Sequence, residues 1–588
     1  MPWDNNKLGE LRPNQIVTTF GPGSIIDAVK DSVTMLDTSY WQKRGKKIID
    51  ARLASYLNVN CFYMPHTSKN GDVPVVTFPY MHVCSKSECG RLFDAREGFN
   101  LDKYLRMGVR CPDCGWPAYP ARFIAICENG HMDDFPWLWW VHRGGKCVHG
   151  KGKNLRVYST GHTSTLADMW VECRDCHAKR SMQGATQQEL FNGLKCSGHH
   201  PFKPNTRNEK CDKLIRPSQR GASNVFFSVN RSAISIPPWI NPLYNLIDEH
   251  LRLIEETKEM FGDDGVTKVF EKYFSGSYSR SEFDEALKKR QENIKEFAEI
   301  KQMEYNAITH HNDPAYATNK KHFKAEDEPL HKGLEKYFKR IIRITRLREV
   351  RVLLGFSRVE ASDPDADQQA NVVYLSKGAK EERWLPAAEM NGEGIFIEFN
   401  KDSIRQWLSI QEVANLSEKY EQCYKDFCEA KGWTVTTLRN AVYVLMHTFA
   451  HLLIKQMSIS SGYSSSAIRE RIYFGDTMAG VLLYTGSADK EGSLGGLVEL
   501  GQMLKLVGMM KEAFQEALLC TNDPECMNNV PAGNNSNGAA CHSCCMISET
   551  SCENGNRMLD RGLLVPVAGR EKNAFFKELV AELCQLEI

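Results

Sequence analysis

The chain has 588 residues, a hydrophobic content of 42%, a charged content of 25% and a formal net charge of +1. This length exceeds what one hydrophobic core organises, so we expect three or four domains, and the composition is typical of a soluble globular protein. A net charge near zero excludes attraction of nucleic acid by a bulk positive field, so any such contact must come from a local basic patch.

The N-terminus, MPWDNNKLGE, lacks the basic and apolar regions of a secretory signal peptide. No apolar run reaches the length of about 18 residues that a membrane-spanning helix needs. With 20 cysteines and no export signal, metal binding is favoured over a disulfide framework. We therefore expect a cytoplasmic protein with no membrane segment.

The motifs predict an α+β, multidomain fold, with a central segment in which apolar residues recur at helical intervals. The expected regions are an N-terminal α/β region (1–80), a zinc-ribbon region (81–220), a mainly helical region (221–345), a mixed α/β connector (346–430) and a C-terminal mixed α/β domain with a cysteine zinc site (431–588).

The zinc-ribbon region begins with two cysteine pairs. Cys84-x4-Cys89 is followed by Cys111-x2-Cys114, and this layout is that of a zinc ribbon, in which two tight turns present two thiolates each to one ion. Isolated buried thiols are the alternative interpretation.

A second, looser set follows in the same region. It consists of Cys173-x2-Cys176, then Cys196 and Cys211, and it predicts a second zinc site. Buried thiols without metal are again the alternative.

Between these sets lies the segment CENGHMDDFPWLWWVHRGGKCVHG. A third site is conceivable from Cys127, His131, Cys147 and His149, although their spacing fits no standard template. The alternative is an aromatic core with a hydrogen-bonded His131 beside it. Asp133 and Asp134 suggest divalent-metal chemistry, and a turn or helix cap explains adjacent aspartates more simply.

A basic run, KRIIRITRLREVRVLLGFSRV, occupies Lys339–Val359. Three of its arginines fall within one arc of a helical wheel, but Leu347 lies inside that arc, so a helix there is expected to give way to a strand. Arginines bind phosphates in bidentate geometry, while solvated positions and internal ion pairs are equally compatible. The candidate nucleic-acid contacts are Arg340, Arg343, Arg346 and Arg351.

A helix is expected from about Val435 to Met457, and it carries His447-x3-His451. Residues four apart share a helix face, so both imidazoles could reach one zinc ion. A metalloprotease would need a glutamate after the first histidine, and Thr448 stands there. Histidines that pack with satisfied hydrogen bonds are the simpler interpretation.

The C-terminal cysteines predict one more zinc site. Cys541-x2-Cys544 supplies a tight turn, Cys552 follows, and Cys526 or Cys520 completes a tetrahedral set. A zinc ion held by four protein ligands has no position left for a reacting water. Together with the N-terminal sets, this site leads us to expect two or three bound Zn²⁺ ions.

Motifs for ATP-driven or hydrolytic chemistry are missing from the sequence. None of the Gly-Lys dipeptides precedes serine or threonine, so there is no P-loop, and Asp248-Glu249-His250 lacks the context of a helicase DExH box. A phospholipase-type HxKxxxxD element fails because Pro329 replaces its aspartate, and no GxSxG elbow occurs. These absences predict a protein that is not an enzyme.

Two sets of long motifs carry a family resemblance. HTFAHLLIKQ, GYSSSAIRERIY, GVLLYT, EGSLGGLVELG and GAACHSCCMISETSCENGNRMLDR resemble the zinc-binding domain at the C-terminus of MrfA-type helicases. RPNQIVTTFGPGSIID, ENGHMDDFPWLWWVHRG and RGASNVFFSVNRSAISIPPW resemble the DrmB family, accessory subunits of the bacterial DISARM anti-phage system.

The resemblance implies a DrmA-like helicase as partner, contact with DNA in defence against phage, and a hetero-oligomer. It also implies a four-cysteine zinc cluster, which Cys526, Cys541, Cys544 and Cys552 match best, with Cys520 in reserve. MrfA fuses this domain to helicase domains, and nothing equivalent precedes it here. The ATPase is therefore expected in the partner.

Three functional hypotheses follow. The first is a non-catalytic, zinc-stabilised scaffold that binds a helicase and DNA. The second is a metal-dependent nuclease or other hydrolase that uses His131, Asp133 and Asp134 or the His447/His451 pair. The third is a structural adaptor without DNA contact, which the near-zero net charge allows.

Overall fold

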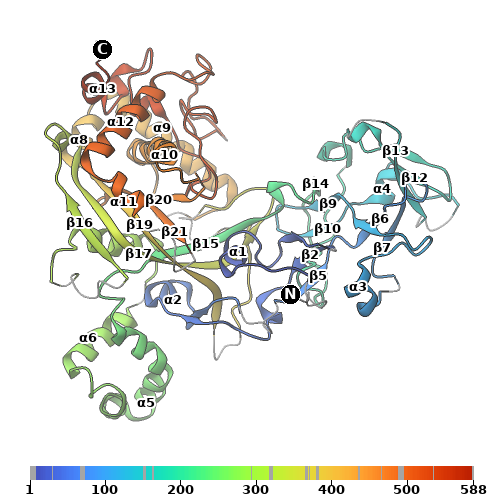
Figure 1. Ribbon diagram of the computed structural model, residues 1–588, viewed down its shortest axis with the longest axis horizontal. Helices are drawn as coiled ribbons and strands as arrows, with labels where there is room; N and C mark the ends of the chain where they lie inside the picture. The colour runs from blue at the N-terminus through green and yellow to red at the C-terminus, as the bar shows by residue number, and fades with distance from the viewer. Residues whose placement is uncertain are drawn as a thin grey trace.

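A long β-sheet joins two lobes, one built around the cysteine-rich N-terminal strands and one around C-terminal helices (Figure 1). The computed structural model describes residues 8–29, 31–66, 73–97, 99–149, 154–161, 165–191, 193–292, 294–314, 316, 322–363, 369, 371–378, 383–434, 437–464, 466–487, 495–533 and 535–585. Among these residues, no helix is both long enough and apolar enough to cross a membrane.

The largest sheet has nine strands, five of which follow the order β15-β17-β19-β21-β20. Its strands are β3 (Lys47–Ile48), β4 (Cys61–Tyr63), β15 (Phe227–Ile234), β16 (Lys324–Glu328), β17 (Phe338–Ser357), β18 (Val373–Tyr374), β19 (Trp384–Phe399), β20 (Ile468–Phe474) and β21 (Ala479–Ser487). All of its neighbouring pairs are antiparallel except β4 with β19.

Three smaller sheets build the N-terminal lobe and its junction with the large sheet. A six-stranded sheet contains β6 (Met81–Cys84), β7 (Arg91–Asp94), β8 (Ala118–Pro120), β11 (Leu155–Ser159), β12 (Met169–Cys173) and β13 (Lys179–Ser181). The three-stranded sheets are β1 (Ile25–Asp27), β2 (Ser32–Met35) and β5 (Val75–Thr77), and β9 (Phe123–Ile126), β10 (Met132–Asp134) and β14 (Arg216–Gln219).

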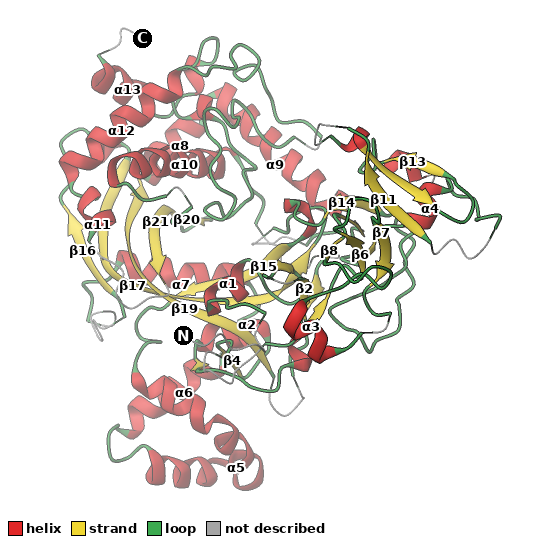
Figure 2. Ribbon diagram, turned by 45° about the vertical axis from the view of Figure 1, so that its right-hand side comes forward, coloured by secondary structure: helices red, strands yellow, loops and turns green. Residues whose placement is uncertain are grey.

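Helices cover both faces of the large sheet, and α5 and α6 project from it as a separate hairpin (Figure 2). The helices are α1 (Pro13–Thr18), α2 (Ala51–Leu57), α3 (Leu101–Met107), α4 (Trp137–Val141), α5 (Pro242–Tyr273), α6 (Arg280–Gln291), α7 (Phe297–Thr309), α8 (Lys401–Leu408), α9 (Gln411–Lys431), α10 (Ala441–Ser461), α11 (Gly496–Leu500), α12 (Met503–Leu518) and α13 (Lys577–Cys584).

The mixture of helices and sheets confirms the α+β fold class. Within the region expected to be mainly helical, α5, α6 and α7 are accompanied by β15, β16 and the start of β17. The large sheet also continues across the expected boundaries at 345/346 and 430/431, because β17 spans the first and β21 pairs with β19 across the second. The large sheet thus contains residues from several of the five expected regions, and the division of the chain into these regions stays a prediction.

The basic run forms a strand up to Ser357, and the expected helical start is wrong. β17 extends over 20 residues. β-branched residues such as Ile341, Ile344 and Val350 favour extended backbone. Pairing with β15, β16 and β19 along its length supplies the hydrogen bonds that a helix would have formed internally.

Side-chain alternation divides the apolar residues of the sheet between two cores. One face packs against α10 through Ile341, Ile395, Ile397, Val481 and Leu483. The opposite face packs against α7 through Ile342, Ile344, Phe396, Leu482 and Tyr484. Successive strand residues point to opposite faces of the sheet. A strand that is covered on both sides therefore has apolar residues on both of its faces.

Helix α10 lies at the centre of the larger core. Asn440 caps its first turn by accepting a hydrogen bond from Val442, and Gly462 ends it in the left-handed conformation with φ of 71°. The helix begins later than the expected Val435, a residue that lies outside the described part of the chain. Nearly all of its residues are buried, including His447 and His451.

Buried ion pairs connect the α7 side of the sheet to its strands. The Arg471 guanidinium on β20 contacts the Glu304 carboxylate on α7 at 2.6 Å, and Tyr473 donates to the same carboxylate at 3.1 Å. The Glu304 carboxylate holds the pKa of Arg471 well above its usual range, against the opposing effect of burial. Each partner therefore depends on the other for its charge inside the core.

We predict that Arg471→Met destabilises the protein by about 3–5 kcal/mol, because Glu304 is left charged and unpaired inside the core. Chemical denaturation monitored by circular dichroism measures the change. Arg252→Ala is the matched control, since it breaks an exposed pair with Glu256 on α5 and should cost no more than about 0.5 kcal/mol. Equal effects of the two substitutions would contradict the prediction.

Candidate metal centres

Most of the cysteines gather into compact groups whose spacing fits metal coordination. All 20 are free thiols, and neighbouring sulfurs within the groups lie 3.4–3.8 Å apart. Four sulfurs at about 2.3 Å from a tetrahedral zinc ion would be about 3.8 Å from one another. A disulfide would require a separation of about 2.05 Å. The sulfurs are thus spaced as ligands of a shared ion.

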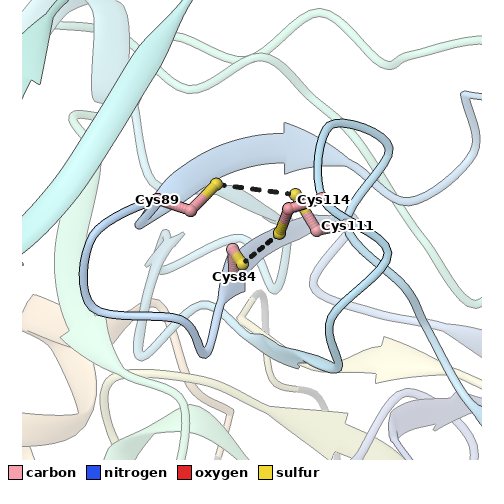
Figure 3. Close-up of side chains that lie close together, drawn as sticks. All are labelled: Cys84, Cys89, Cys111 and Cys114. Carbon is pink, nitrogen blue, oxygen red and sulfur yellow. Dashed lines mark hydrogen bonds between the residues drawn. The ribbon is translucent and has the colours of Figure 1, made fainter.

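The first group is the expected zinc ribbon, with Cys84, Cys89, Cys111 and Cys114 facing one another (Figure 3). Cys84 ends β6, and Cys89 lies in the turn that leads to β7. Gly115, with φ of 72°, allows the chain to turn directly after the last ligand. The sulfurs of Cys84 and Cys114 are 3.4 Å apart, and those of Cys89 and Cys111 are 3.8 Å apart.

A metal ion would supply much of the stability of this ribbon. Among the described residues, the cluster at its cysteine turns buries Cys84, Phe93 and Cys111, with Val109 and Ala118 packed against them. So small a core does not offset the entropy of ordering its loops, and structural zinc commonly provides the missing free energy.

The looser set predicted from the sequence is wrong, because its members do not form one site. They are Cys173, Cys176, Cys196 and Cys211. Cys196 and Cys211 join Cys127 and His131 instead. In that second group the sulfur of Cys127 lies 3.3 Å from Nδ1 of His131, and the Cys196 sulfur accepts a hydrogen bond from the Gly198 amide at 3.3 Å.

The third group unites Cys173 and Cys176 with Cys147 and His142. The Cys147 and Cys173 sulfurs are 3.7 Å apart, and Nε2 of His142 lies 3.3 Å from the Cys176 sulfur. Nδ1 of His142 lies 2.8 Å from the Leu138 carbonyl, so it carries the proton and leaves the Nε2 lone pair available.

The suggested set of Cys127, His131, Cys147 and His149 is therefore also wrong. Its first two members lie in the second group and Cys147 lies in the third, while His149 is exposed and belongs to neither. Each Cys-x2-Cys pair is a local turn that the sequence reveals. Which turns meet depends on the pairing of β9 with β14 and of β11 with β12, which sequence spacing does not encode.

The fourth group, in the C-terminal domain, consists of Cys520, Cys526, Cys541 and Cys544. Cys520 is thus a member in place of Cys552, which lies beside His447. The sulfurs of Cys520 and Cys541 are 3.5 Å apart, and those of Cys526 and Cys544 are 3.7 Å apart. Residues 491–494, at the start of the EGSLGGLVELG motif, lie outside the described part of the chain.

Local hydrogen bonds favour the thiolate form of individual cysteines, most strongly Cys127 and Cys544. The thiol of Cys196 and then His131 lower the pKa of Cys127 to about 4, against the effect of burial. The thiol of Cys545 lowers the pKa of Cys544 to about 5. In the same groups, the hydrogen bond to Cys127 and burial raise the pKa of Cys196, and burial raises the pKa of Cys526. Thiolates are the form that binds zinc, so each group pairs a thiol that ionises readily with one that a metal ion would have to deprotonate.

The two adjacent aspartates do not form a shared carboxylate site. Asp133 accepts a hydrogen bond from Ser197 at 2.7 Å, whereas Asp134 accepts one from the Met81 amide at 3.0 Å. They are successive residues of β10 and so point to opposite faces. Burial raises the pKa of Asp134 to about 7. His131, the third residue of the hydrolase hypothesis, lies among thiols.

The candidate nucleic-acid contacts all lie on β17, and one of them, Arg346, is exposed. The other three form ion pairs within the chain: Arg340 with Glu398 (2.8 Å), Arg343 with Glu328 (2.8 Å) and Arg351 with Glu349 (2.9 Å). Arg351 also lines a polar groove of about 900 Å³.

We predict that Cys176→Ala/Cys211→Ala loses two zinc ions per chain, because the two ligands belong to different groups. Cys173→Ala/Cys176→Ala, with both changes in one group, should lose one. Mass spectrometry of the purified, acid-digested protein counts the metal. Equal losses from the two double variants would contradict the division into separate sites.

We further predict that Cys520→Ser removes the zinc ion of the fourth group and destabilises the C-terminal domain, because a structural ligand carries folding free energy. Metal analysis and thermal unfolding measure both effects. Cys423→Ser is the control, since that thiol lies on the neighbouring α9, outside the ligand group, and donates to the carbonyls of Gly533 and Asn535. Retention of the zinc ion by Cys520→Ser would remove Cys520 from the ligand set.

Comparison with known proteins agrees with this geometry. Residues 449–545 match the MrfA Zn-binding domain, a range that includes Cys520, Cys526, Cys541 and Cys544 but ends before Cys552. Residues 12–227 match a domain of unknown function (DUF8724). DISARM protein DrmB of Bacillus paralicheniformis is 43% identical over 571 residues, which cover 94% of this chain and 100% of the relative. The chain therefore belongs to the DrmB family of DISARM proteins and carries an MrfA-type zinc-binding domain.

Proposed function

We propose that this chain is a cytoplasmic, non-catalytic accessory subunit of a DISARM-type anti-phage system, in which zinc-stabilised loops bind a helicase and DNA. The observation that carries the proposal is the composition of the four cysteine-rich groups. Each offers four protein ligands, so a tetrahedral zinc ion bound there has no open position for a substrate or a reacting water. Such sites stabilise surfaces and do not turn over a substrate.

The helicase half of the proposal rests on family membership. The relative is named as a DISARM protein, and the sequence of this chain contains no P-loop of its own. Energy from ATP would then come from another subunit. The three groups in the N-terminal lobe fix loops at the ends of short strands, which suits a rigid docking surface for such a partner.

The DNA half is supported by the polar groove beside the large sheet. Six basic side chains line it, but Arg231 and Arg471 are buried, and Arg351 and Arg469 pair with the buried Glu349. The half-buried Lys431 and Arg557 are therefore the proposed phosphate contacts, and the groove also holds the carboxylates of Glu360, Glu470, Glu549 and Glu553. Hydroxyl groups of Thr18, Ser228 and Ser551 and the ring of Phe226 add hydrogen-bonding and stacking surface. Phosphate contacts of this kind orient a strand without reading its sequence.

We predict co-purification with the helicase of the same defence system and DNA binding that weakens steeply with salt, because phosphate contacts release counterions. Lys431→Glu should weaken DNA binding relative to the wild-type protein at the same salt concentration. Lys272→Glu, an equal charge change at an exposed position of α5, should leave DNA binding unchanged. Fluorescence anisotropy with duplex, overhang and single-stranded DNA, at two salt concentrations, measures both effects.

Two outcomes would contradict the proposal. Failure to bind any of the three DNA forms, even with the helicase present, would leave a structural adaptor. Cleavage of DNA with magnesium or manganese that disappears in Asp133→Ala/Asp134→Ala would instead favour the hydrolase.

A further inference from the structure

A fifth group of metal-ligand side chains lies apart from the thiol-rich groups, where α10, β20 and a C-terminal loop meet. It consists of His447 and His451 from α10, Glu470 from β20 and Cys552. Nε2 of His447 lies 2.9 Å from Oε1 of Glu470 and 3.2 Å from the sulfur of Cys552. Nε2 of His451 lies 3.3 Å from the same Glu470 oxygen.

The hydrogen bonds of the two rings fix which nitrogens carry protons. Nδ1 of His447 lies 3.2 Å from the Met558 carbonyl, and Nδ1 of His451 lies 2.9 Å from the Cys545 carbonyl. A carbonyl oxygen only accepts, so both Nδ1 atoms must donate. In neutral rings both Nε2 atoms then present lone pairs, and both are directed at the carboxylate of Glu470.

Three hydrogen-bond acceptors therefore face one another, namely the two Nε2 atoms and the Glu470 carboxylate. This arrangement requires a positive charge between them. Protonating one ring leaves the lone pair of the other against the carboxylate. Protonating both places two cations with ring centroids 4.4 Å apart in a site where both rings are buried, which is costly. A divalent metal ion removes the conflict, and its charge balances one carboxylate and one thiolate.

We propose that His447, His451, Glu470 and Cys552 bind a zinc ion through Nε2, Nε2, a carboxylate oxygen and sulfur. Ligand atoms at about 2.0–2.3 Å from a tetrahedral zinc ion lie about 3.3–3.6 Å apart, close to the spacing of these atoms. The mixed nitrogen, oxygen and sulfur donors suit zinc and disfavour magnesium or calcium. The two Nδ1–carbonyl bonds act as the outer contacts that orient ligating histidines.

Two further observations support a bound ion. Among the residues that the structure describes, Oε2 of Glu470 is buried and has no hydrogen-bond partner, so protein donors alone do not satisfy this buried carboxylate. Glu470 and Cys552 also line the polar groove, and Cys552 is half-buried, so an ion has a route of entry.

The ion would join three elements that are distant in sequence. Backbone contacts already attach the C-terminal loop to β20, because the Glu470 amide donates to the Ser551 carbonyl and the Glu553 amide donates to Oε1 of Glu470, each at 3.1 Å. A zinc ion adds a bond from that loop to α10. The site thereby fixes the wall of the groove that holds Ser551, Glu553 and Arg557.

Metal analysis of the full-length protein tests the proposal. Wild-type protein should contain one zinc ion more than the four cysteine-rich groups account for. His451→Ala/Cys552→Ser removes two of the four ligands and should lose that one ion. Thr448→Ala/Cys428→Ser is the matched control, with one buried change on α10 and one on α9, and it should keep the wild-type count. An unchanged count in His451→Ala/Cys552→Ser would overturn the site.

A second measurement on wild-type protein covers the case in which that variant fails to fold. Anomalous diffraction at the zinc edge should show a peak about 2.0–2.3 Å from all four ligand atoms. Peaks in the thiol-rich groups with none between His447, His451, Glu470 and Cys552 would overturn the proposal, whatever the outcome for helicase and DNA binding.

Discussion

The pairing of β17 with β19 is the constraint on which the rest of the fold depends. Register partners run from Phe338 and Phe399 at one end to Val352 and Ala387 at the other. The remaining strands of the large sheet attach to this pair directly or through β21 and β4. Residues on both sides of β19 are buried, so helices must cover both faces of the large sheet. The C-terminal helices and α7 meet that requirement from opposite sides.

The N-terminal lobe solves a different problem, because its strands are short and its loops are long. The main apolar core there is built around Phe135, Trp137 and Trp140, and it reaches the ribbon strands through Val83 and Leu92. The ribbon's cysteine turns lie outside it, around a separate small cluster with Phe93. Zinc coordination would replace apolar burial as the source of order in these loops. The chain thus combines a lobe held by packing with a lobe in which metal ligands would supplement a smaller apolar core.

Charge inside the large sheet is balanced locally. Glu349 is fully buried between Arg351 and Arg469, and their guanidinium groups lower its pKa to about 2 despite burial. Some arginines that suggest a basic patch in the sequence are therefore engaged in ion pairs inside the protein. A surface for DNA must come from side chains that the groove exposes together, and the linear basic run is a poor guide to them.

Sequence alone determined the fold class, the family and the local turns that supply thiolates in pairs. Cys-x2-Cys spacing is a short-range property, because one turn of backbone brings both sulfurs to the same side. The tertiary structure decided which turns meet, and so it separated Cys176 from Cys211, exchanged Cys552 for Cys520 and placed Cys552 beside His447. It also decided that the basic run is a strand, since pairing partners distant in sequence overrode its helical pattern. These outcomes depend on contacts between residues far apart in the chain, and no local pattern encodes such contacts.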